Sequence, residues 1–151
     1  MHDNIKLFLK RQTCTTICCL DDGQMPYCFS CFYAFNSETG LIYFKSSVKS
    51  HHYILLTKNP GVAGTVLRDK LNKLVTKGIQ WTGNVLPESN LLARNSWTNY
   101  HKQYPMAIAM EGDVITVRLN NIKMTDSTMG FGKKIIWDRM AKSGLHAYVR
   151  R

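Results

Sequence analysis

The chain has 151 residues, of which 44% are hydrophobic and 20% charged, and its formal net charge is +10. This length fits one domain over residues 1–151, and the apolar content excludes a disordered chain. The longest apolar stretch, Met106 to Met110, is far too short to span a membrane. Lysines and an arginine enclose the apolar residues 7–9, so we expect no signal peptide and a cytoplasmic location.

The predicted elements are short strands interrupted by short helices. A helix over 3–11 precedes three strands joined by turns, at 13–20, 25–35 and 41–46. A short helix at 51–58 follows, with Ser50 as its N-cap, and the remaining elements are strands at 62–67 and 74–85, a long helix at 87–104 and an alternating strand at 113–124. Six antiparallel strands with a few short helices predict a mainly β fold, a small six-stranded barrel.

Five cysteines lie between residues 14 and 31, and their odd number indicates reduced thiols. Cys28-Phe29-Ser30-Cys31 has the CxxC spacing of zinc and redox sites. Because side chains alternate faces along a strand, we expect Cys28 and Cys31 to point to opposite sides of the sheet. The strand pattern therefore favours small buried residues over a metal site.

The most informative segment joins a strand end to a helix start: Lys45, Ser46, Ser47, Lys49, Ser50, His51 and His52. The first amides of a helix are unpaired donors at the positive end of the helix dipole. With the hydroxyls, Lys49 and His51 beside them, they are suited to a phosphate dianion. The alternative is an ordinary capped helix with a solvated lysine. Adjacent helix positions point about 100° apart, so we expect no metal site at the paired histidines.

The C-terminal tail is basic, with six basic residues and one acid between Gly132 and Arg151. Gly130-Phe131-Gly132-Lys133-Lys134 lacks the spacing of a P-loop and indicates a tight turn with exposed lysines. The tail suits either nucleic acid or the gathering of an anionic cofactor. The aromatic residues form no RNP-like motif, so nucleic acid is the less favoured partner.

The order of these pieces resembles a known family. The segments that carry the resemblance are Gly23-Gln24-Met25-Pro26, Thr39-Gly40-Leu41-Ile42-Tyr43-Phe44, Lys49-Ser50-His51-His52, the stretch 59–66, and Lys77-Gly78-Ile79-Gln80-Trp81-Thr82-Gly83. Together they are similar to the pyridoxamine phosphate oxidase-like FMN-binding split barrel. The tail from Thr125 to Trp137, with its GFGKKxxW pattern, resembles a small bacterial branch of that superfamily.

The resemblance implies a homodimer with FMN at the subunit interface. It assigns the flavin phosphate to the segment from Lys45 to His52, and the isoalloxazine edge to Gln80. It also implies that Lys133, Lys134 and Trp137 reach the partner's flavin. His51 stands where relatives often have an arginine. Pyridoxamine phosphate oxidases proper end in an Arg-Leu-x-Pro stretch that this chain lacks, so pyridoxamine phosphate is not carried over as its substrate.

These observations predict an FMN-binding oxidoreductase of unknown substrate, in which the flavin supplies hydride or electron transfer. No side chain stands out as a general acid or base. Two alternatives stay open: a module that binds or senses a cofactor without turnover, and a basic barrel that binds nucleic acid.

Overall fold

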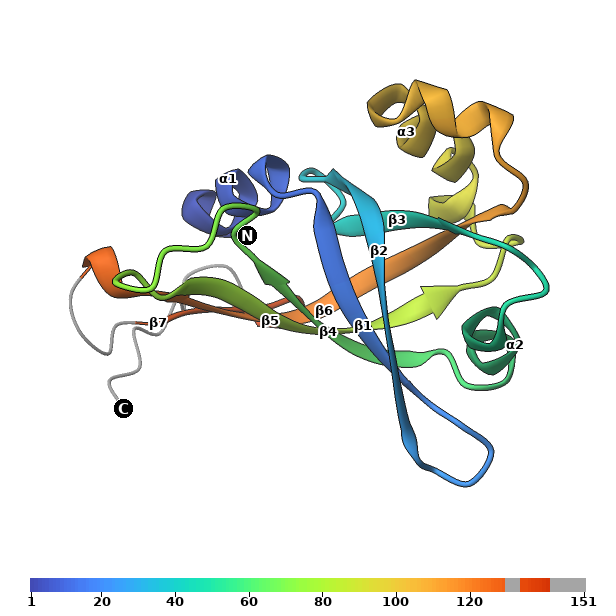
Figure 1. Ribbon diagram of the computed structural model, residues 1–151, viewed down its shortest axis with the longest axis horizontal. Helices are drawn as coiled ribbons and strands as arrows, with labels where there is room; N and C mark the ends of the chain where they lie inside the picture. The colour runs from blue at the N-terminus through green and yellow to red at the C-terminus, as the bar shows by residue number, and fades with distance from the viewer. Residues whose placement is uncertain (130–133, 142–151) are drawn as a thin grey trace.

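The structure is a computed structural model that describes residues 1–129 and 134–141. Its helices are α1 (Asp3–Arg11), α2 (His51–Lys58) and α3 (Ser96–Gln103), with 3₁₀ turns η1 (Leu91–Ala93), η2 (Pro105–Ala109) and η3 (Ser127–Met129). Its strands are β1 (Cys14–Leu20), β2 (Pro26–Asn36), β3 (Leu41–Ser46), β4 (Gly61–Leu67), β5 (Lys77–Leu86), β6 (Asp113–Asp126) and β7 (Lys134–Asp138). Figure 1 shows the helices placed around one strongly curved sheet.

The sheet closes into a barrel. Its strand order is β3-β2-β1-β4-β5-β6, and β3 also pairs with β6, so all six strands have two neighbours. Every pairing is antiparallel. This arrangement confirms the predicted six-stranded split barrel. Closure removes the free edges that an open sheet of this size would expose.

Strand β6 makes the closure possible because it is long enough to serve two neighbours on one side. Its first half pairs with β3, where Leu41 lies opposite Arg118. Its second half pairs with β7, where Trp137 lies opposite Ile122. On its other side β6 pairs with β5 from Thr116 to Asp126, with one register shift at Thr82/Gly83. Strand β7 is therefore an addition to the barrel, and the sequence reasoning did not predict it.

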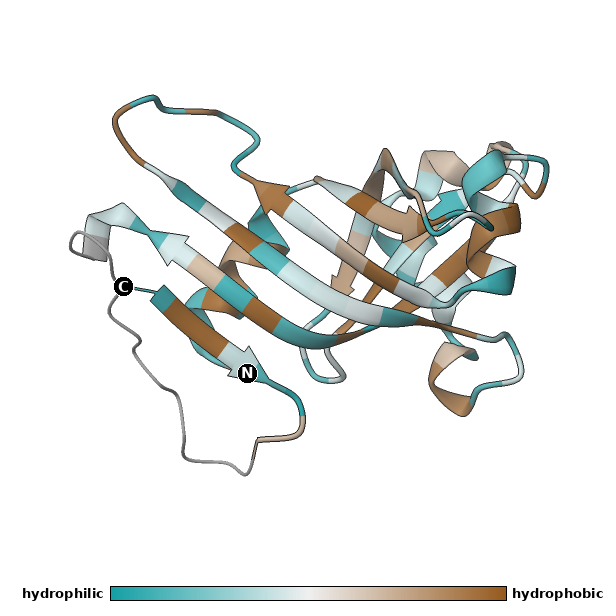
Figure 2. Ribbon diagram, turned by 90° about the horizontal axis from the view of Figure 1, so that it is seen from below, coloured by the Kyte–Doolittle hydropathy of each residue, from teal (hydrophilic) through white to brown (hydrophobic). Residues whose placement is uncertain are grey.

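The barrel interior is filled by apolar side chains from alternate positions of the strands, an alternation visible along the ribbons in Figure 2. Both α1, through Ile5 and Phe8, and α2, through Leu55, contribute to this core. At Gly64 the absence of a side chain admits the buried Trp81 ring, because a Cβ there would collide with it.

A second core lies outside the barrel. Outward-facing side chains of β2 and β3 pack against η1, α3 and η2 in a cluster of Ala34, Leu41, Tyr43, Leu86, Ala93, Tyr100 and Ala107. Helix α3 and its flanking turns therefore cover one part of the barrel's outer surface. None of the helices in residues 1–129 and 134–141 is long and apolar enough to cross a membrane.

The predicted long helix over 87–104 is wrong in its first half. Strand β5 runs to Leu86, so Pro87 lies in a connection and does not begin a helix. The Asn90 side chain accepts a hydrogen bond from the Leu92 amide at 3.0 Å and starts the short turn η1. Local bonding by asparagine competes with helix formation. The α-helix consequently begins only at Ser96.

The boundaries of two predicted strands also change. Strand β5 begins at Lys77, because the Asn72 side chain accepts from the Leu74 amide at 2.9 Å and holds a turn there. Leu74 is exposed, and Val75 lies before the strand. Strand β6 continues to Asp126, two residues beyond its predicted end.

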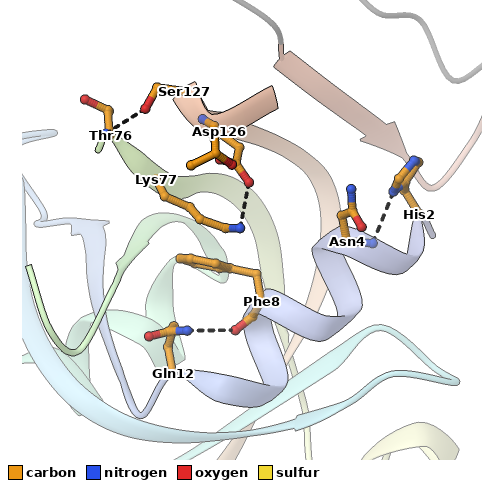
Figure 3. A network of polar contacts seen from close by, with 9 residues as sticks. His2, Asn4, Phe8, Gln12, Thr76, Lys77, Asp126 and Ser127 are labelled. Atoms are coloured by element: carbon orange, nitrogen blue, oxygen red, sulfur yellow. Dashed lines mark hydrogen bonds and ion pairs between the residues drawn. The ribbon is translucent and has the colours of Figure 1, made fainter. Parts of the chain in front are cut away.

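Four neighbouring strands, β2, β1, β4 and β5, contain one charged residue among them, Lys77. That charge is paired: Lys77 Nζ lies 2.6 Å from an oxygen of the buried Asp126, as Figure 3 shows. The same close-up shows the Thr76 amide donating to Ser127 Oγ at 3.0 Å, which holds this end of β5 against η3. A chain with 20% charged residues thus keeps this part of its barrel free of unpaired charge.

Candidate functional site

Three polar side chains meet where β3 ends and α2 begins. Ser46 Oγ lies 2.9 Å from Ser50 Oγ and 2.7 Å from His52 Nε2, and Ser50 Oγ lies 3.2 Å from the same nitrogen. Ser46 is buried, while Ser50 and His52 are partly buried. We call Ser46, Ser50 and His52 the cradle. It places two hydroxyls and an imidazole beside the unpaired amides of the first helical turn.

The local sequence explains why the cradle forms. The Ser50 amide donates to the Ser47 carbonyl at 3.0 Å, which turns the chain after β3. Ser50 then caps α2, its Oγ accepting from the Tyr53 amide at 3.3 Å. Gly112, at φ 124°, packs on the Ser46 backbone so closely that a Cβ would collide with the Ser46 carbonyl oxygen. The capping serine predicted from sequence is therefore confirmed, and the structure adds the contact with Ser46.

Strand β2 supplies aromatic walls that the sequence reasoning missed. The Phe29 ring stacks on His52 with centroids 3.9 Å apart and planes 13° from parallel. The Tyr27 ring meets His51 edge-on, with centroids 4.9 Å apart. Tyr27 and Phe29 alternate along one face of β2, and this period-2 spacing was the available signal. In Figure 1 the β1–β2 hairpin extends beyond the barrel, and its Asp22 forms an ion pair with Lys58 of α2 at 2.6 Å.

The electrostatics of the site come from Lys49 and the two histidines. Burial lowers the pKa of His52, and the neighbouring His51 lowers it further. His52 is therefore neutral at pH 7 and acts in the cradle as a hydrogen-bonding group. Lys49 and His51 are exposed at the rim, where Lys49 provides a cation for an anionic ligand. Ser47 is also exposed, and its Oγ accepts from the Lys49 amide at 3.3 Å.

Lys45 does not join the cradle. Side chains alternate along β3, so Lys45 points to the outer face while Ser46 faces the other way. Its Nζ donates to the Ala107 carbonyl at 2.8 Å and lies 3.4 Å from His101 Nε2. His101 is buried, and its Nδ1 lies 2.8 Å from the Trp97 carbonyl. The structure therefore places Lys45 under the second core.

Gln80 stands at one end of a transverse row of outward-facing residues. Ser30, Thr16, Thr65 and Gln80 are successive register partners on β2, β1, β4 and β5. Three strand spacings of about 4.8 Å put Gln80 roughly 14 Å from Ser30, whose side chain points to the opposite face of the sheet from its neighbour Phe29. Thr16 Oγ1 and Ser30 Oγ are 3.0 Å apart. The row offers three hydroxyls and an amide on the uncharged part of the barrel.

Two of the predicted tail residues, Lys134 and Trp137, are not at the cradle within one chain. Lys134 and Trp137 lie on β7, opposite Thr125 and Ile122 of β6, and Trp137 packs partly against the barrel core. The Arg139 guanidinium lies 5.3 Å from the Trp137 ring centroid. Lys133 and most of the glycine-rich motif fall outside the described residues.

A cavity of about 830 Å³ adjoins α2 at Tyr53, Leu56 and Thr57. Its walls come from α2, the end of β5, η1, the start of α3 and the start of β6. At its edge the Tyr53 hydroxyl donates to Asp113 Oδ2 at 2.8 Å, and this hydrogen bond raises the pKa of Tyr53. Within the described residues no three His, Cys, Asp or Glu side chains are grouped to hold a metal ion.

Several solved structures share this fold. A heme-binding protein from Mycobacterium smegmatis superposes with a TM-score of 0.71 at 11% identity, over 87% of this chain and 56% of that one. HutZ, a heme storage protein from Vibrio cholerae, gives 0.60 at 14% identity, over 78% and 87% of the two chains. A pyridoxamine 5'-phosphate oxidase-related, FMN-binding protein from Nostoc punctiforme gives 0.66 at 7% identity, over 91% and 90%. At these identities the likeness establishes the fold alone, a split barrel.

Sequence relatives are closer, although no family model matches the chain. A UPF0306 protein of Photorhabdus laumondii is 35% identical over 135 residues, which cover 89% of this chain and 94% of the relative. A UPF0306 protein of Cronobacter sakazakii is 33% identical over 141 residues, covering 91% and 94%. The barrel topology, the near-complete coverage and these identities lead to one assignment: the chain belongs to the UPF0306 family.

Proposed function

We propose that this protein binds FMN, with the phosphate at the cradle and the ring lying across the uncharged outer strands toward Gln80. The observation that carries the proposal is the convergence of Ser46, Ser50 and His52 on the first turn of α2. A helix start with added hydroxyl donors and a nearby cation suits a phosphate dianion. Solved structures of this fold include flavin-binding proteins, which supports the choice of ligand.

The transverse row supports the placement of the ring. An isoalloxazine ring has two faces that can stack on other groups and one polar edge that exchanges hydrogen bonds. The row from Ser30 to Gln80 offers hydroxyls and an amide to such an edge, on the face of the sheet opposite to Phe29. When bound, FMN would supply hydride or electron transfer. The chain's own residues would hold the phosphate, orient the ring and exclude water from one of its faces.

The same strands support a homodimer. The outward positions of these strands carry no charged residue, and they include exposed apolar side chains such as Phe32 and Leu67. A face without charges is expected where a second copy covers it, because charged residues are depleted from interface cores. A partner on this face would cover the second side of the flavin ring. The residues Lys133, Lys134 and Trp137 that reach that flavin would then come from the partner.

The phosphate assignment is tested with two ligands that differ only in the phosphate. Lys49→Ala should weaken FMN binding by ~1.5–3 kcal/mol more than riboflavin binding, as for a charge-assisted contact. Lys102→Ala, at another exposed lysine, is the matched control and should change neither. Equal losses for the two ligands in a fluorescence titration would remove Lys49 from the phosphate site.

The dimer assignment is tested by linkage. If FMN binds only the dimer, free FMN at a hundred times its dissociation constant stabilises the dimer by ~2.7 kcal/mol. Light scattering on diluted protein with and without FMN measures this shift. A monomer that retains FMN at full affinity would place the ligand within one chain.

Heme is the second candidate, favoured by the heme-binding proteins that share the fold and by the imidazoles of His51 and His52 beside Tyr27 and Phe29. Absorbance of the purified protein separates the two ligands, since heme shows an intense Soret band and FMN the yellow bands of a flavin. Reduction of bound flavin by NADH or NADPH, followed by reoxidation, distinguishes an oxidoreductase from a module that only binds or senses the cofactor.

A further inference from the structure

Two cysteines face each other across the β1–β2 hairpin, one on each strand. Cys18 is the register partner of Cys28. The Tyr33 amide donates to the Thr13 carbonyl at 3.0 Å, and the Asp21 amide donates to the Met25 carbonyl at 2.9 Å. These bonds fix the phase of the ladder, because hydrogen-bonded and non-hydrogen-bonded pairs alternate along antiparallel strands. Cys18 and Cys28 therefore form a non-hydrogen-bonded pair.

Non-hydrogen-bonded pairs bring side chains closest together. Their Cα atoms are about 4.5 Å apart, which is inside the ~4.4–6.8 Å range that a disulfide spans. The adjacent pair of the same type shows the effect, with Thr16 Oγ1 and Ser30 Oγ separated by 3.0 Å. Pro26, which has no amide donor, lies opposite Leu20 at another position of this type. The register thus places the two residues at a Cα separation that a disulfide can span.

The CxxC pair has the opposite geometry. Cys31 lies opposite the buried Thr15 and faces inward, whereas Cys28 faces outward. Burial raises the pKa of Cys31 to about 12. Cys14 lies opposite Phe32, and Cys19 is buried opposite Tyr27. Cys18 and Cys28 are therefore the two thiols that share one face and one cross-strand position.

We propose that Cys18 and Cys28 form a reversible intrachain disulfide when the protein meets a peroxide. The Cys28 thiolate attacks one peroxide oxygen, the O–O bond breaks, and a sulfenic acid and one water result. The Cys18 sulfur then attacks the sulfenic sulfur and releases the second water. Two thiols are oxidised by two electrons, one peroxide is reduced to two waters, and a dithiol reductant reverses the change.

The exposure of the two thiols and the pKa of Cys18 indicate which thiol reacts first with the peroxide. Cys28 is exposed and is the thiol that a peroxide reaches first. Cys18 is less exposed, and burial together with its hydrogen bond to Cys28 raises the pKa of its thiol. A thiol with a raised pKa is a poor first nucleophile but an adequate second one when its target is adjacent. On its other side Cys18 is the register partner of Ala63 of β4, whose small side chain leaves the two thiols accessible from that side.

The cross-link would change the candidate site as well as the hairpin. Cys28 stands between Tyr27 and Phe29, the two aromatic walls of the cradle. Closing the bond at Cys28 would fix the strand that carries both rings. The disulfide itself does not depend on the proposed FMN site, so either assignment can fail alone.

The test is peptide mapping by mass spectrometry without reduction, after hydrogen peroxide treatment of dilute protein, so that no second copy covers the thiols. We expect a cross-linked Cys18–Cys28 peptide and a fall from five titratable thiols to three. Dithiothreitol should restore all five. Cys31→Ser and Cys14→Ser are matched controls that should still form the cross-link, and Cys18→Ser should form none.

Three results would overturn the proposal: a Cys28–Cys31 cross-link, a disulfide between chains on a non-reducing gel, or sulfinic acid at Cys28 with Cys18 still reduced. Mapping of the wild-type chain decides among them, so the answer does not require that any variant fold.

Discussion

The barrel has two outer surfaces that differ in what covers them. The outward side chains of β3 and the start of β6 lie under α3 and η2, where Leu41 and Tyr43 are each 1% exposed. Within residues 1–129 and 134–141, the outward side chains of β1, β4 and β5 have no such cover, and Leu67 is 56% exposed. The covered surface carries Lys45, whose Nζ donates to the Ala107 carbonyl, whereas the strands of the open surface carry one charged residue, the paired Lys77. The absence of charge on the open surface is what indicates a partner and a ligand there, since solvent-facing strands usually carry polar and charged residues.

The largest expected effect is on the free energy of unfolding, which should respond differently to the same change on the two surfaces. Leu41→Ala should lower the free energy of unfolding by ~2–5 kcal/mol, because it empties a packed position under α3. Leu67→Ala, the same change on the open surface, should cost less than ~0.5 kcal/mol in dilute protein. Urea unfolding of both variants measures this. Similar losses would mean that the open surface is packed within one chain.

The next effect is on association. Thr65 lies at the centre of the transverse row, and Thr65→Lys puts a charge where we propose that a second copy packs. We expect roughly a hundredfold weaker dimerisation, about 2.7 kcal/mol, with little change in monomer stability. Thr57→Lys on the exposed side of α2 is the control. Sedimentation that shows both variants equally dimeric would move the interface elsewhere.

A smaller effect concerns the one charge of the open strands. Burial alone would raise the pKa of Asp126, but the hydrogen bonds from Lys77 and Thr128 outweigh it and lower the pKa. The lowered pKa stabilises the fold above the ordinary pKa of an aspartate, and this stability is lost as pH falls through the lowered value. Asp126→Asn should cost ~1–3 kcal/mol at pH 7 and flatten the acid limb of the unfolding curve.

The control for Asp126 is an exposed ion pair. Asp3, whose side chain is 95% exposed, lies 3.6 Å from Lys6 Nζ, and Asp3→Asn should change stability by less than ~0.5 kcal/mol. If the two asparagine variants behave alike in thermal unfolding at pH 7, the Lys77–Asp126 pair has no special part in keeping these strands neutral.

The smallest effect is the titration of His52 at the edge of the open surface. A histidine whose pKa is lowered in the fold favours the unfolded chain when it is protonated. Stability is therefore complete above the ordinary histidine pKa and declines as pH falls from there toward the lowered value. His52→Gln should remove this slope in urea midpoints between pH 7 and 5. His51→Gln should keep most of it, because burial is the larger cause of the shift.

Much of the candidate site was readable from the sequence because it is local. Ser50 as the N-cap, the hydroxyls of Ser46 and Ser47 and the nearby Lys49 lie within five residues, and the cap is present as predicted. The aromatic walls were not readable in the same way. Tyr27 and Phe29 reach the histidines only because the hairpin folds over α2, a contact between segments more than twenty residues apart.

The sequence by itself determined the mainly β class, most strand positions and the opposite orientation of Cys28 and Cys31, because a period of two and short turns are properties of neighbouring residues. Tertiary structure alone decided that Lys45 lies under α3, that Gln80 is in line with Ser30, and that Cys18 meets Cys28. These facts depend on register, which is set by which strands pair and where the barrel closes. The pairing energies between strands distant in sequence determine that register, and no short segment of the sequence contains both partners.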